Sequence, residues 1–358
     1  MRDRKKILLA VGGTGGHIYP AQALARDLQK ADEELEILFS GGRLASNPYF
    51  HHNAFPYREV QSCSPFREGP LKTALTLSKG VKESLSLCRE FSPQLIVGFG
   101  SFHSFPLLVA ARLKKIPYLL VESNALPGKV NRLFSPKALL SAVQFEEAGD
   151  TLRGKIVSAK IPFWAEGEKV SPSREEARRS FGLDPELLTL LVFGGSQGAS
   201  SINEGMAALE LGTSHQVLHF CGEEKEVGSL EESYRERGIR AHVRAFEKEM
   251  ERAWAAADFA ICRSGAGTIN EMIAYGVPGV LIPWPHAADD HQHRNAEVIS
   301  QTGGALLLAE KEMVSLSEKV GAGIQRIEEM RDALHLIKKQ EKEELSKLVL
   351  RHIHEVVE

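Results

Sequence analysis

Two glycine turns are the first features of this 358-residue sequence that could do chemistry. The segment KKILLAVGGTGGH recurs 182 residues later as TLLVFGGSQGA. The matching residues are Gly12 and Gly194, Gly13 and Gly195, Thr14 and Ser196, and Gly16 and Gly198. A glycine turn that opens a helix leaves main-chain N–H groups free beside the positive end of the helix dipole, which suits a phosphate. Two such turns predict two phosphate-bearing ligands, one in each half of the chain. The alternative is a pair of tight turns without ligands.

His17 directly follows the first turn. A histidine side chain can take up a hydroxyl proton near neutral pH, so His17 is a candidate general base for a transfer reaction. A histidine that only bonds the backbone or a phosphate is the alternative. Neither turn carries the Gly-Lys-Ser/Thr of a P-loop, and Ile18 stands where a dinucleotide fingerprint needs its third glycine. An NAD-dependent oxidoreductase is therefore disfavoured.

A third segment, CRSGAGTINEMIAYGVP, places Glu271 in the first or second turn of a helix predicted to begin near Thr268. A carboxylate there can accept hydrogen bonds from both hydroxyls of a ribose. The alternative is a glutamate favoured only by the helix dipole.

The segment WPHAADDHQHRNA is dense in polar side chains. Its histidines and aspartates lack the spacing of a helical metal site and no cysteine joins them, so we expect no metal. Gln292 and Asn295 offer donors and acceptors for a sugar instead. Two more polar segments, FGSFHS and ESNALPGKVNR, follow predicted strands, and open α/β sheets bind ligands at such strand ends. They contain the candidate ligand contacts Phe102, Ser104 and Glu122.

These segments need strands and helices to hold them. Short, continuously apolar runs predict strands that are covered on both faces, as in parallel sheets. They lie at residues 6–11, 35–39, 95–98, 118–122, 138–142, 155–157, 188–193, 216–220, 241–244, 259–262 and 279–283. Helical patterns such as residues 20–31 alternate with them. With the repeat, this alternation predicts two Rossmann-like, doubly wound α/β domains. We expect residues 1–161, joined by a C-terminal helix at 340–358, to form the first domain, and residues 165–339 the second.

Composition excludes other classes. The net charge is −3, so bulk charge does not favour a nucleic-acid partner. The four cysteines form no Cys-x-x-Cys pair and indicate buried thiols in a reducing compartment. No run approaches the 18 apolar residues of a membrane span, and the apolar run after the N-terminus is too short for a signal peptide.

One amphipathic segment could touch a lipid surface. Its residues are Leu71, Lys72, Leu75, Lys79 and Lys82. Lysines interleaved with leucines can bind an anionic membrane, although an ordinary helix with a solvated lysine face is the alternative. We therefore expect a peripheral protein at the cytoplasmic face of the membrane.

Four motifs in the same order resemble the MurG glycosyltransferase family. They are GGTGGHIYPAQALA, ESNALPGKVNR, FGGSQGASSINE and CRSGAGTINEMIAYGVPGVLIPWPHAADDHQHRNA. The resemblance implies the GT-B architecture, with two Rossmann-like domains. It also implies inverting transfer of N-acetylglucosamine from UDP-N-acetylglucosamine to the muramoyl C4 hydroxyl of lipid I, giving lipid II and UDP. No metal or other cofactor is implied. Implied partners are both substrates, an anionic membrane surface and proteins of a cell-wall synthesis complex.

The resemblance also implies roles for residues. His17 would be the base, Glu271 would hold the ribose, and Ser196 would face the diphosphate of the donor. The acceptor or its diphosphate would meet Gly13, Phe102, Ser104 and Glu122. The donor contacts it implies are Thr14, Gly15, Gly16, Asn124, Ser196, Glu247 (through its main chain), Ala266, Gly267, Thr268, Ile269, Asn270, Glu271 and Gln292.

Three departures from the family pattern stand out. Ser101-Phe102 replaces Gly-Tyr, which removes a hydroxyl. Residues 159–164 lack the family's arginine before the linker, and Glu247 replaces an apolar residue. Other GT-B enzymes, namely a glycolipid glycosyltransferase or a sugar-nucleotide epimerase, therefore stay open, as does a non-catalytic UDP-sugar-binding protein of a membrane complex.

Overall fold

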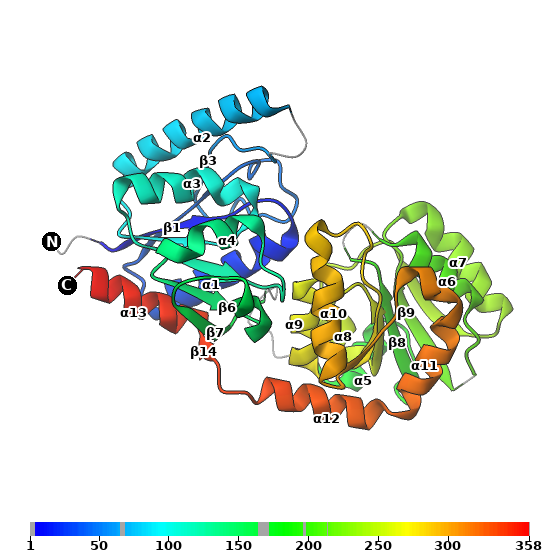
Figure 1. Ribbon diagram of the computed structural model, residues 1–358. Helices are drawn as coiled ribbons and strands as arrows, with labels where there is room; N and C mark the ends of the chain where they lie inside the picture. Colours follow the sequence, from blue (N-terminus) through cyan, green and yellow to red (C-terminus); the bar gives the residue numbers. More distant parts are fainter. Residues whose placement is uncertain (1–3, 65–68, 164–171, 196–197, 213, 358) are drawn as a thin grey trace. The chain divides into compact units, whose positions relative to one another are not determined.

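The computed structural model describes residues 4–64, 69–163, 172–195, 198–212 and 214–357. The chain divides into two compact units (Figure 1). Unit 1 is Met1–Trp164 with Glu341–Glu358, and unit 2 is Ala165–Gln340. The predicted boundaries, 161/165 and 339/340, fall within a few residues of these limits.

Unit 1 is built on one parallel sheet. The strand order is β14-β7-β6-β5-β4-β1-β2-β3, so the order reverses direction between β1 and β4. The strands are β1 (Lys6–Ala10), β2 (Glu36–Gly41), β3 (Tyr57–Glu59), β4 (Leu95–Gly98), β5 (Tyr118–Glu122), β6 (Leu140–Val143), β7 (Ile156–Lys160) and β14 (Glu343–Glu344). Its helices are α1 (Gly15–Ala31), α2 (Pro70–Phe91), α3 (Ser101–Lys114), α4 (Lys129–Phe134) and α13 (Leu345–Val357), with short 3₁₀ turns at Ser135–Lys137 and Glu146–Asp150.

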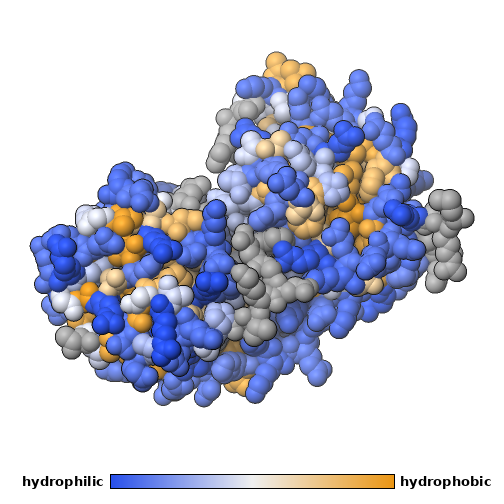
Figure 2. Space-filling view, turned by 180° about the vertical axis from the view of Figure 1, so that it is seen from behind, coloured by the Kyte–Doolittle hydropathy of each residue, from blue (hydrophilic) through white to orange (hydrophobic). Residues whose placement is uncertain are grey.

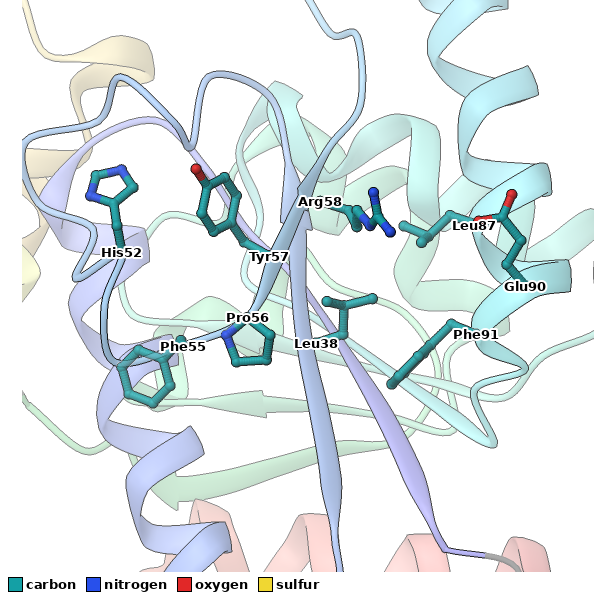
Figure 3. A pocket seen from close by; sticks show the side chains of 9 residues that line it. All are labelled: Leu38, His52, Phe55, Pro56, Tyr57, Arg58, Leu87, Glu90 and Phe91. Carbon is teal, nitrogen blue, oxygen red and sulfur yellow. The ribbon is translucent and has the colours of Figure 1, made fainter.

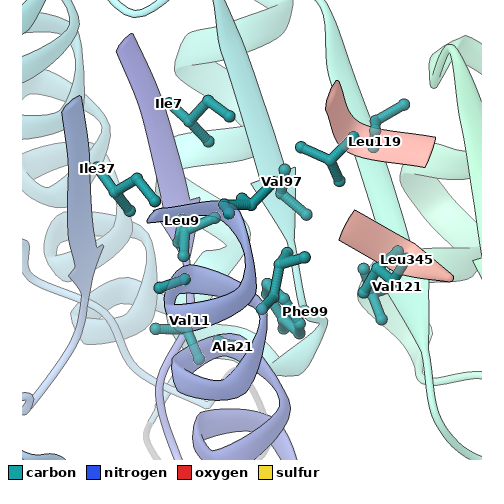
Figure 4. Close-up of a cluster of buried hydrophobic side chains, with 14 of the residues drawn as sticks. Ile7, Leu9, Val11, Ala21, Ile37, Val97, Phe99, Leu119, Val121 and Leu345 are labelled. Carbon is teal, nitrogen blue, oxygen red and sulfur yellow. The ribbon is translucent and has the colours of Figure 1, made fainter. Parts of the chain in front are cut away.

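The sheet of unit 1 is apolar because helices cover both of its faces. Alternate residues of a strand point to opposite faces, and β1 serves two cores in this way. Ile7 and Leu9 join the core beneath α1 and α13, whereas Leu8 and Ala10 join the core beneath α3. Figure 4 shows the first of these cores, with Leu345 beside residues of the central strands.

Unit 2 repeats this design with a six-stranded parallel sheet of order β10-β9-β8-β11-β12-β13. Here the order reverses between β8 and β11. The strands are β8 (Leu188–Phe193), β9 (His215–Phe220), β10 (Arg240–Arg244), β11 (Phe259–Cys262), β12 (Gly279–Leu281) and β13 (Ala305–Leu307). The helices are α5 (Arg174–Ser180), α6 (Ser200–Ala208), α7 (Glu224–Glu236), α8 (Met250–Ala256), α9 (Ala266–Tyr275), α10 (His291–Gln301), α11 (Leu316–Gln325) and α12 (Ile327–Lys338), with 3₁₀ turns at Ala288–Asp290 and Glu310–Ser315. The predicted pair of doubly wound α/β domains is confirmed.

Several predicted boundaries were wrong. The helix predicted at 340–358 begins only at Leu345, because Glu343 and Glu344 pair with Ala159 and Lys160 as strand β14. Two polar residues give no periodic signal, so the sequence hid this edge strand, and β3 and β13 were missed as equally short strands.

Helix starts also moved. The helix predicted at 20–31 begins at Gly15, directly after the first turn. In the second copy of the repeat the helix begins at Ser200, so the turn after β8 is longer than the turn after β1.

Candidate functional site

The two sheets place the repeated glycine turn at their switch points. In each unit, the two strands on either side of the reversal end at the same edge of the sheet. In open α/β sheets, ligands bind outside the carboxyl ends of such strands. In unit 1 these ends lead into Gly12–Thr14 after β1 and Gly100–Ser101 after β4. In unit 2 they lead into the turn after β8 and the turn Arg263–Gly265 after β11.

The first glycine turn leads straight into α1. Thr14 is the residue before the helix, and its side chain makes no capping hydrogen bond. Its carbonyl accepts from the N–H of His17 at 3.1 Å. The first N–H groups of a helix have no partner within it, so Gly15 and Gly16 present donors at the positive end of α1. This geometry suits an anion.

His17 lies in the first turn of α1, because this helix begins five residues before the predicted start at residue 20. Its Nδ1 is 3.5 Å from the Thr14 hydroxyl, and the side chain is partly exposed. Its use as a base stays a prediction.

Asn47 contacts this turn from another segment of the chain, and sequence reasoning missed it. Its Nδ2 donates to the carbonyl of Gly13 at 2.7 Å, and Asn47 is only 8% exposed. Gly13 has φ +92, a conformation that side chains rarely adopt, so the buried amide holds a turn that needs glycine. Asn47 lies in a segment without regular structure, and no motif marks it.

Glu122 organises the loop after β5. It is 5% exposed, and one oxygen accepts from the main-chain N–H and the side-chain amide of Asn124, at 3.0 and 3.1 Å. The other oxygen accepts from the Gly128 N–H at 2.9 Å and from Asn131 Nδ2 at 3.0 Å. The geometry therefore gives Glu122 a positioning role for Asn124, and direct contact of either residue with a substrate stays a prediction.

The two predicted contacts on α3 differ in environment. Ser104 is fully buried, and its hydroxyl donates to the carbonyls of Gly100 at 2.5 Å and Ser101 at 2.9 Å. Phe102 is partly exposed and packs against the core of unit 1 beneath α3. Ser104 thus stabilises the first turn of α3, and acceptor contact by either side chain is untested.

The second glycine turn follows β8. Ser196, the predicted diphosphate contact, lies outside the described residues. Gly198 has φ +71, and a Cβ there would meet the carbonyl of Cys221 at 2.5 Å, so this turn passes too close to β9 for a side chain. The same carbonyl accepts from Asn203 Nδ2 on α6 at 3.0 Å.

The turn after β11 joins the loop after β12. Ser264 is fully buried, and its hydroxyl donates to the carbonyl of Gln292 at 2.8 Å. Asn295 Nδ2 donates to the Ser264 carbonyl at 3.1 Å. The Gln292 side chain accepts from the main-chain N–H of Trp284 at 3.0 Å. The Gln292 side-chain oxygen therefore closes the loop before α10, and no described residue accepts a hydrogen bond from its amide N–H groups, which leaves them for a ligand.

Arg263 is a second residue that sequence reasoning missed. It is 8% exposed and donates to the carbonyls of Ile282 and Pro283, both at 3.2 Å, and to the hydroxyl of Ser201 at 3.2 Å. An ion pair with Glu310 at 2.5 Å balances its charge. Arg263 thus ties the ends of β11 and β12 to the start of α6.

The helix α9 carries most predicted donor contacts. It begins at Ala266 after Gly265, without a side-chain cap. Gly267, Thr268 and Asn270 are partly exposed. Ile269 is fully buried, and its N–H bonds the carbonyl of Gly265 at 3.0 Å, so the structure gives Ile269 a packing role.

Glu271 lies in the second turn of α9, beside Trp254. Its carboxylate accepts from Trp254 Nε1 at 2.9 Å. Trp254 is 1% exposed and stacks on Tyr275 with ring planes 9° apart. Burial raises the pKa of Glu271 to about 7, and the hydrogen bond from Trp254 opposes this shift. Among the described residues, Trp254 is its hydrogen-bond partner, so the carboxylate keeps acceptor capacity for a ribose.

Glu247 folds back on its own turn. One oxygen accepts from the N–H groups of Lys248 at 2.8 Å and Glu249 at 2.9 Å, and the other is 3.4 Å from Arg244 Nη1. Because the side chain is used locally, the main-chain contact expected at Glu247 stays possible without a role for its charge.

The face of α2 that was predicted to meet a membrane is exposed. Leu71 is 76% and Leu75 66% exposed, and Lys72, Lys79 and Lys82 are exposed as well. Figure 2 shows apolar groups like these within a mostly hydrophilic surface. In the part of the chain that the structure describes, no helix is long and apolar enough to cross a bilayer.

Neither a metal-binding group nor a hollow adds to this site among the described residues. The described residues include no group of three histidine, cysteine or acidic side chains placed to hold a metal. A hollow of about 600 Å³ lies between the segment before β3 and the end of α2 (Figure 3). None of its lining residues is a predicted site residue: Leu38, His52, Phe55, Pro56, Tyr57, Arg58, Leu87, Glu90 and Phe91.

Comparisons with known proteins cover both units. Residues 7–142 match the glycosyltransferase family 28 N-terminal domain, and residues 189–352 match the C-terminal domain of that family. The crystal structure of Acinetobacter baumannii MurG has a TM-score of 0.77 at 23% identity and covers 98% of this chain and 99% of its own. A transferase from Siraitia grosvenorii in complex with UDP has a TM-score of 0.67 at 13% identity, over 99% of this chain and 100% of its own. These structures share the fold.

Sequence relatives are closer. A protein of Protochlamydia amoebophila is 40% identical over 86% of this chain and 84% of its own length. One of Desulforudis audaxviator is 33% identical over 86% of each. Both are named UDP-N-acetylglucosamine–N-acetylmuramyl-(pentapeptide) pyrophosphoryl-undecaprenol N-acetylglucosamine transferase. The predicted resemblance is thereby confirmed, and the chain belongs to this family of N-acetylglucosamine transferases, the MurG family.

Proposed function

We propose that this protein transfers N-acetylglucosamine from UDP-N-acetylglucosamine to the muramoyl C4 hydroxyl of lipid I, with inversion, giving lipid II and UDP. The observation that carries the proposal is the 40% identity, over 86% of the chain, to a relative named for this reaction. Two switch points with glycine turns support it, because the reaction joins two diphosphate-bearing substrates.

The donor belongs to unit 2 in this proposal. Glu271 accepts hydrogen bonds from the ribose hydroxyls, and the start of α9 supplies N–H groups to the nucleotide. The free amide N–H groups of Gln292 suit hydroxyls of the transferred sugar. N–H groups of the turn after β8 stabilise the charge that develops on the diphosphate as UDP leaves.

The acceptor belongs to unit 1. The diphosphate of lipid I lies at the first glycine turn, where α1 presents the N–H groups of Gly15 and Gly16. His17 takes the proton of the C4 hydroxyl as that oxygen bonds to the anomeric carbon, and the bond from this carbon to UDP breaks. The step balances without oxidant or reductant, and main-chain N–H groups at the helix starts stabilise the leaving diphosphate in place of a metal, so we expect transfer to persist in a chelator.

The polyprenyl chain of lipid I requires access to a membrane. Leu71, Leu75, Lys79 and Lys82 follow one another at helical spacing along an exposed face of α2, so apolar contact and attraction to anionic headgroups combine there. We propose that this face holds the protein at the cytoplasmic surface of the membrane. Proteins of a cell-wall synthesis complex are further expected partners.

Transfer of labelled N-acetylglucosamine to a short-chain lipid I analogue tests the proposal, with and without EDTA. Labelled product of the mass of lipid II, in equal yield in both samples, is the expected result. Calorimetry with UDP-N-acetylglucosamine runs in parallel. Binding without transfer would contradict the proposed acceptor and favour another glycolipid acceptor or a non-catalytic UDP-sugar-binding protein. Loss of transfer in EDTA would contradict the metal-free reaction.

A further inference from the structure

His103 occupies a place beside the first glycine turn that glycines keep open. It is the third residue of α3, directly after the turn that follows β4. A Cβ on Gly12 would lie 2.6 Å from His103 Cβ, and a Cβ on Gly42 would lie 2.5 Å from its Nδ1. Side chains at these two positions would therefore collide with His103. Two separate segments leave room for one imidazole at the switch point of unit 1.

A hydroxyl fixes the orientation of this ring. His103 Nδ1 is 2.6 Å from Ser62 Oγ, which belongs to the segment between β3 and α2. When Ser62 donates this hydrogen bond, the ring proton resides on Nε2, which then becomes a donor. No described residue forms a hydrogen bond with Nε2.

The Cδ2 edge of the ring faces Gly13. A Cβ on Gly13 would lie 3.4 Å from His103 Cδ2, the carbon bonded to Nε2, and 3.3 Å from the hydroxyl oxygen of Ser101. Ser101 has φ +68, an unusual conformation for a serine, and its hydroxyl accepts from the His103 N–H at 3.1 Å. His103 and Ser101 therefore bring side chains that can donate hydrogen bonds to the first glycine turn, next to the positive end of α1.

The charge state of His103 fits a neutral donor. Burial lowers its pKa, and the positive charge of Arg43 lowers it further. The imidazole is therefore neutral near pH 7 and keeps one N–H. The positive charge of Arg43 acts on His103. An anion bound beside Gly13 therefore meets the N–H donor of His103 and a nearby positive charge.

We propose that His103 is an acceptor-binding residue, whose Nε2–H donates a hydrogen bond to a phosphate oxygen of the acceptor at the Gly12–Gly13 turn. The inference rests on the proposed function, because it assumes an acceptor with a diphosphate in unit 1. It also accounts for a departure of this chain from the family pattern. At position 102 this chain has phenylalanine where the family pattern has tyrosine, so a hydroxyl is missing. His103, the next residue, restores a hydrogen-bond donor to the same turn.

A matched pair of variants separates ligand binding from packing. In His103→Gln, the side-chain amide can take the place of Nε2 and donate to a ligand, but it abandons Ser62. In His103→Asn, the amide can keep the bond to Ser62 but cannot reach the place of Nε2. Loss of a hydrogen bond to a charged group is expected to raise the acceptor KM of His103→Asn roughly 10- to 100-fold, with KM for UDP-N-acetylglucosamine unchanged. The rise in acceptor KM should be much smaller in His103→Gln than in His103→Asn.

Two further variants complete the experiment. Ser62→Ala frees the ring to turn, and we expect a smaller rise in acceptor KM than in His103→Asn. His354→Asn, at an exposed position of α13, is the control and should behave as the parent protein. Melting temperatures within a few degrees of the parent show that each variant is folded.

The outcomes are distinct. If the parent protein forms product but His103→Asn keeps the parent's acceptor KM, the inference is overturned while the proposed function stands. If His103→Asn is normal and His103→Gln is impaired, the bond to Ser62 matters and contact with the ligand does not. If the parent protein forms no product from lipid I analogues, the proposed function itself fails.

Discussion

At the scale of residues, the candidate site consists of side chains with different degrees of internal commitment. The Glu122 carboxylate accepts hydrogen bonds from its own loop and from Asn131 of α4, and Ser104 serves the first turn of α3. Among the residues that the structure describes, Trp254 is the hydrogen-bond partner of Glu271, and the amide N–H groups of Gln292 have none. The side chains with spare hydrogen-bonding capacity are the better candidates for substrate contact, because a buried group already satisfied gains little from a ligand.

His17 gives the sharpest test at this scale. If it is the general base, His17→Ala lowers kcat by roughly 10²–10⁴-fold, the usual contribution of a positioned base. The KM values for lipid I and for UDP-N-acetylglucosamine should change far less, because the turn binds its ligand through main-chain N–H groups, which the substitution leaves in place. Steady-state kinetics with varied acceptor checks this. A fall in kcat of less than about tenfold would remove His17 from the role of base.

Glu271 predicts a pH dependence of donor binding. Its pKa is raised to about 7, so the side chain is mostly ionised at pH 8 and mostly protonated at pH 6. A protonated acid is a poorer acceptor for the two ribose hydroxyls, so KM for UDP-N-acetylglucosamine should rise as the pH falls across this range. Glu271→Ala should raise KM at pH 8 by about one to two orders of magnitude, as expected for lost paired hydrogen bonds.

Kinetics at pH 6, 7 and 8 measure both effects of Glu271. In Glu271→Gln the side chain no longer titrates, so the dependence of KM on pH should flatten. Equal slopes in this variant and the parent protein would show that another group causes the dependence. An unchanged KM in Glu271→Ala would remove the ribose contact.

At the scale of elements, the turns after β8 and β9 are held by a buried polar network. His219 on β9 is fully buried, and its two nitrogens lie 3.0 Å from the hydroxyl of Tyr234 on α7 and 3.0 Å from Asn203 Oδ1 on α6. Asn203 also donates to the carboxylate of Glu226. The network thus joins β9 to α6, which follows the second glycine turn, and to α7, which follows β9, and sequence periodicity gave no sign of it.

This network makes the stability of unit 2 sensitive to acid. Burial lowers the pKa of His219 to about 4, against an ordinary value near 6.5. Between these values the unfolded chain binds the proton and the folded unit does not. The free energy of unfolding is therefore highest above about pH 6.5 and falls as the pH drops toward 4, by on the order of 3 kcal/mol from this residue.

Urea unfolding at pH 7.5 and pH 5 measures that loss for His219. Tryptophan fluorescence is a suitable signal for unit 2, because Trp254 and Trp284 both belong to it. Carboxylates also weaken the protein in acid, so the test is the difference between the parent and His219→Gln. The variant should lose less stability between the two pH values. An equal loss would show that His219 does not titrate as expected.

The exposed face of α2 predicts a charge-dependent membrane contact. Each lysine near an anionic surface contributes about 1 kcal/mol, so replacing Lys72, Lys79 and Lys82 by Glu should abolish measurable binding to anionic vesicles. Vesicle sedimentation with and without phosphatidylserine measures it. The control replaces Lys225, Lys311 and Lys339, which are exposed residues of unit 2, with the same change in net charge. Equal binding of the two variants would leave α2 an ordinary solvated helix.

At the scale of the whole molecule, the chain closes unit 1 with its last helix. Leu345, Leu348, Val349 and Ile353 of α13 are buried in the same core as Ile7 and Leu9 of β1. The chain therefore returns to unit 1 after completing unit 2, and the folding of unit 1 requires residues from both ends of the sequence.

Leu348→Ala tests this closure. Truncating a fully buried leucine costs about 2–5 kcal/mol of folding free energy, and we expect that loss in unit 1. Val356→Ala, at a 36% exposed position of the same helix, should change stability by less than about 0.5 kcal/mol. Differential scanning calorimetry resolves the change, and titration with UDP follows unit 2. If Leu348→Ala lowers the binding free energy of UDP by as much as it lowers the folding free energy, the loss is not confined to unit 1.

The sequence by itself determined the architecture and the outline of the site. Continuous apolar runs identified the central strands, because buried parallel strands must be apolar on both faces. The repeated glycine turn identified the two switch points, since such turns need glycine wherever they occur. His17 and Glu271 were predicted as site residues for the same reason: they stand next to turns that local sequence alone defines.

Only the tertiary structure decided which distant residues complete the turns. Asn47 reaches Gly13, Ser62 reaches His103, and Trp254 reaches Glu271, each from another segment of the chain. Strand β14 exists only because β7 offers it an edge. Such contacts depend on the folded path of the backbone, and a hydrogen bond between remote residues leaves no period or spacing in the sequence. The local turns could therefore be predicted, whereas the partners that fix their geometry could not.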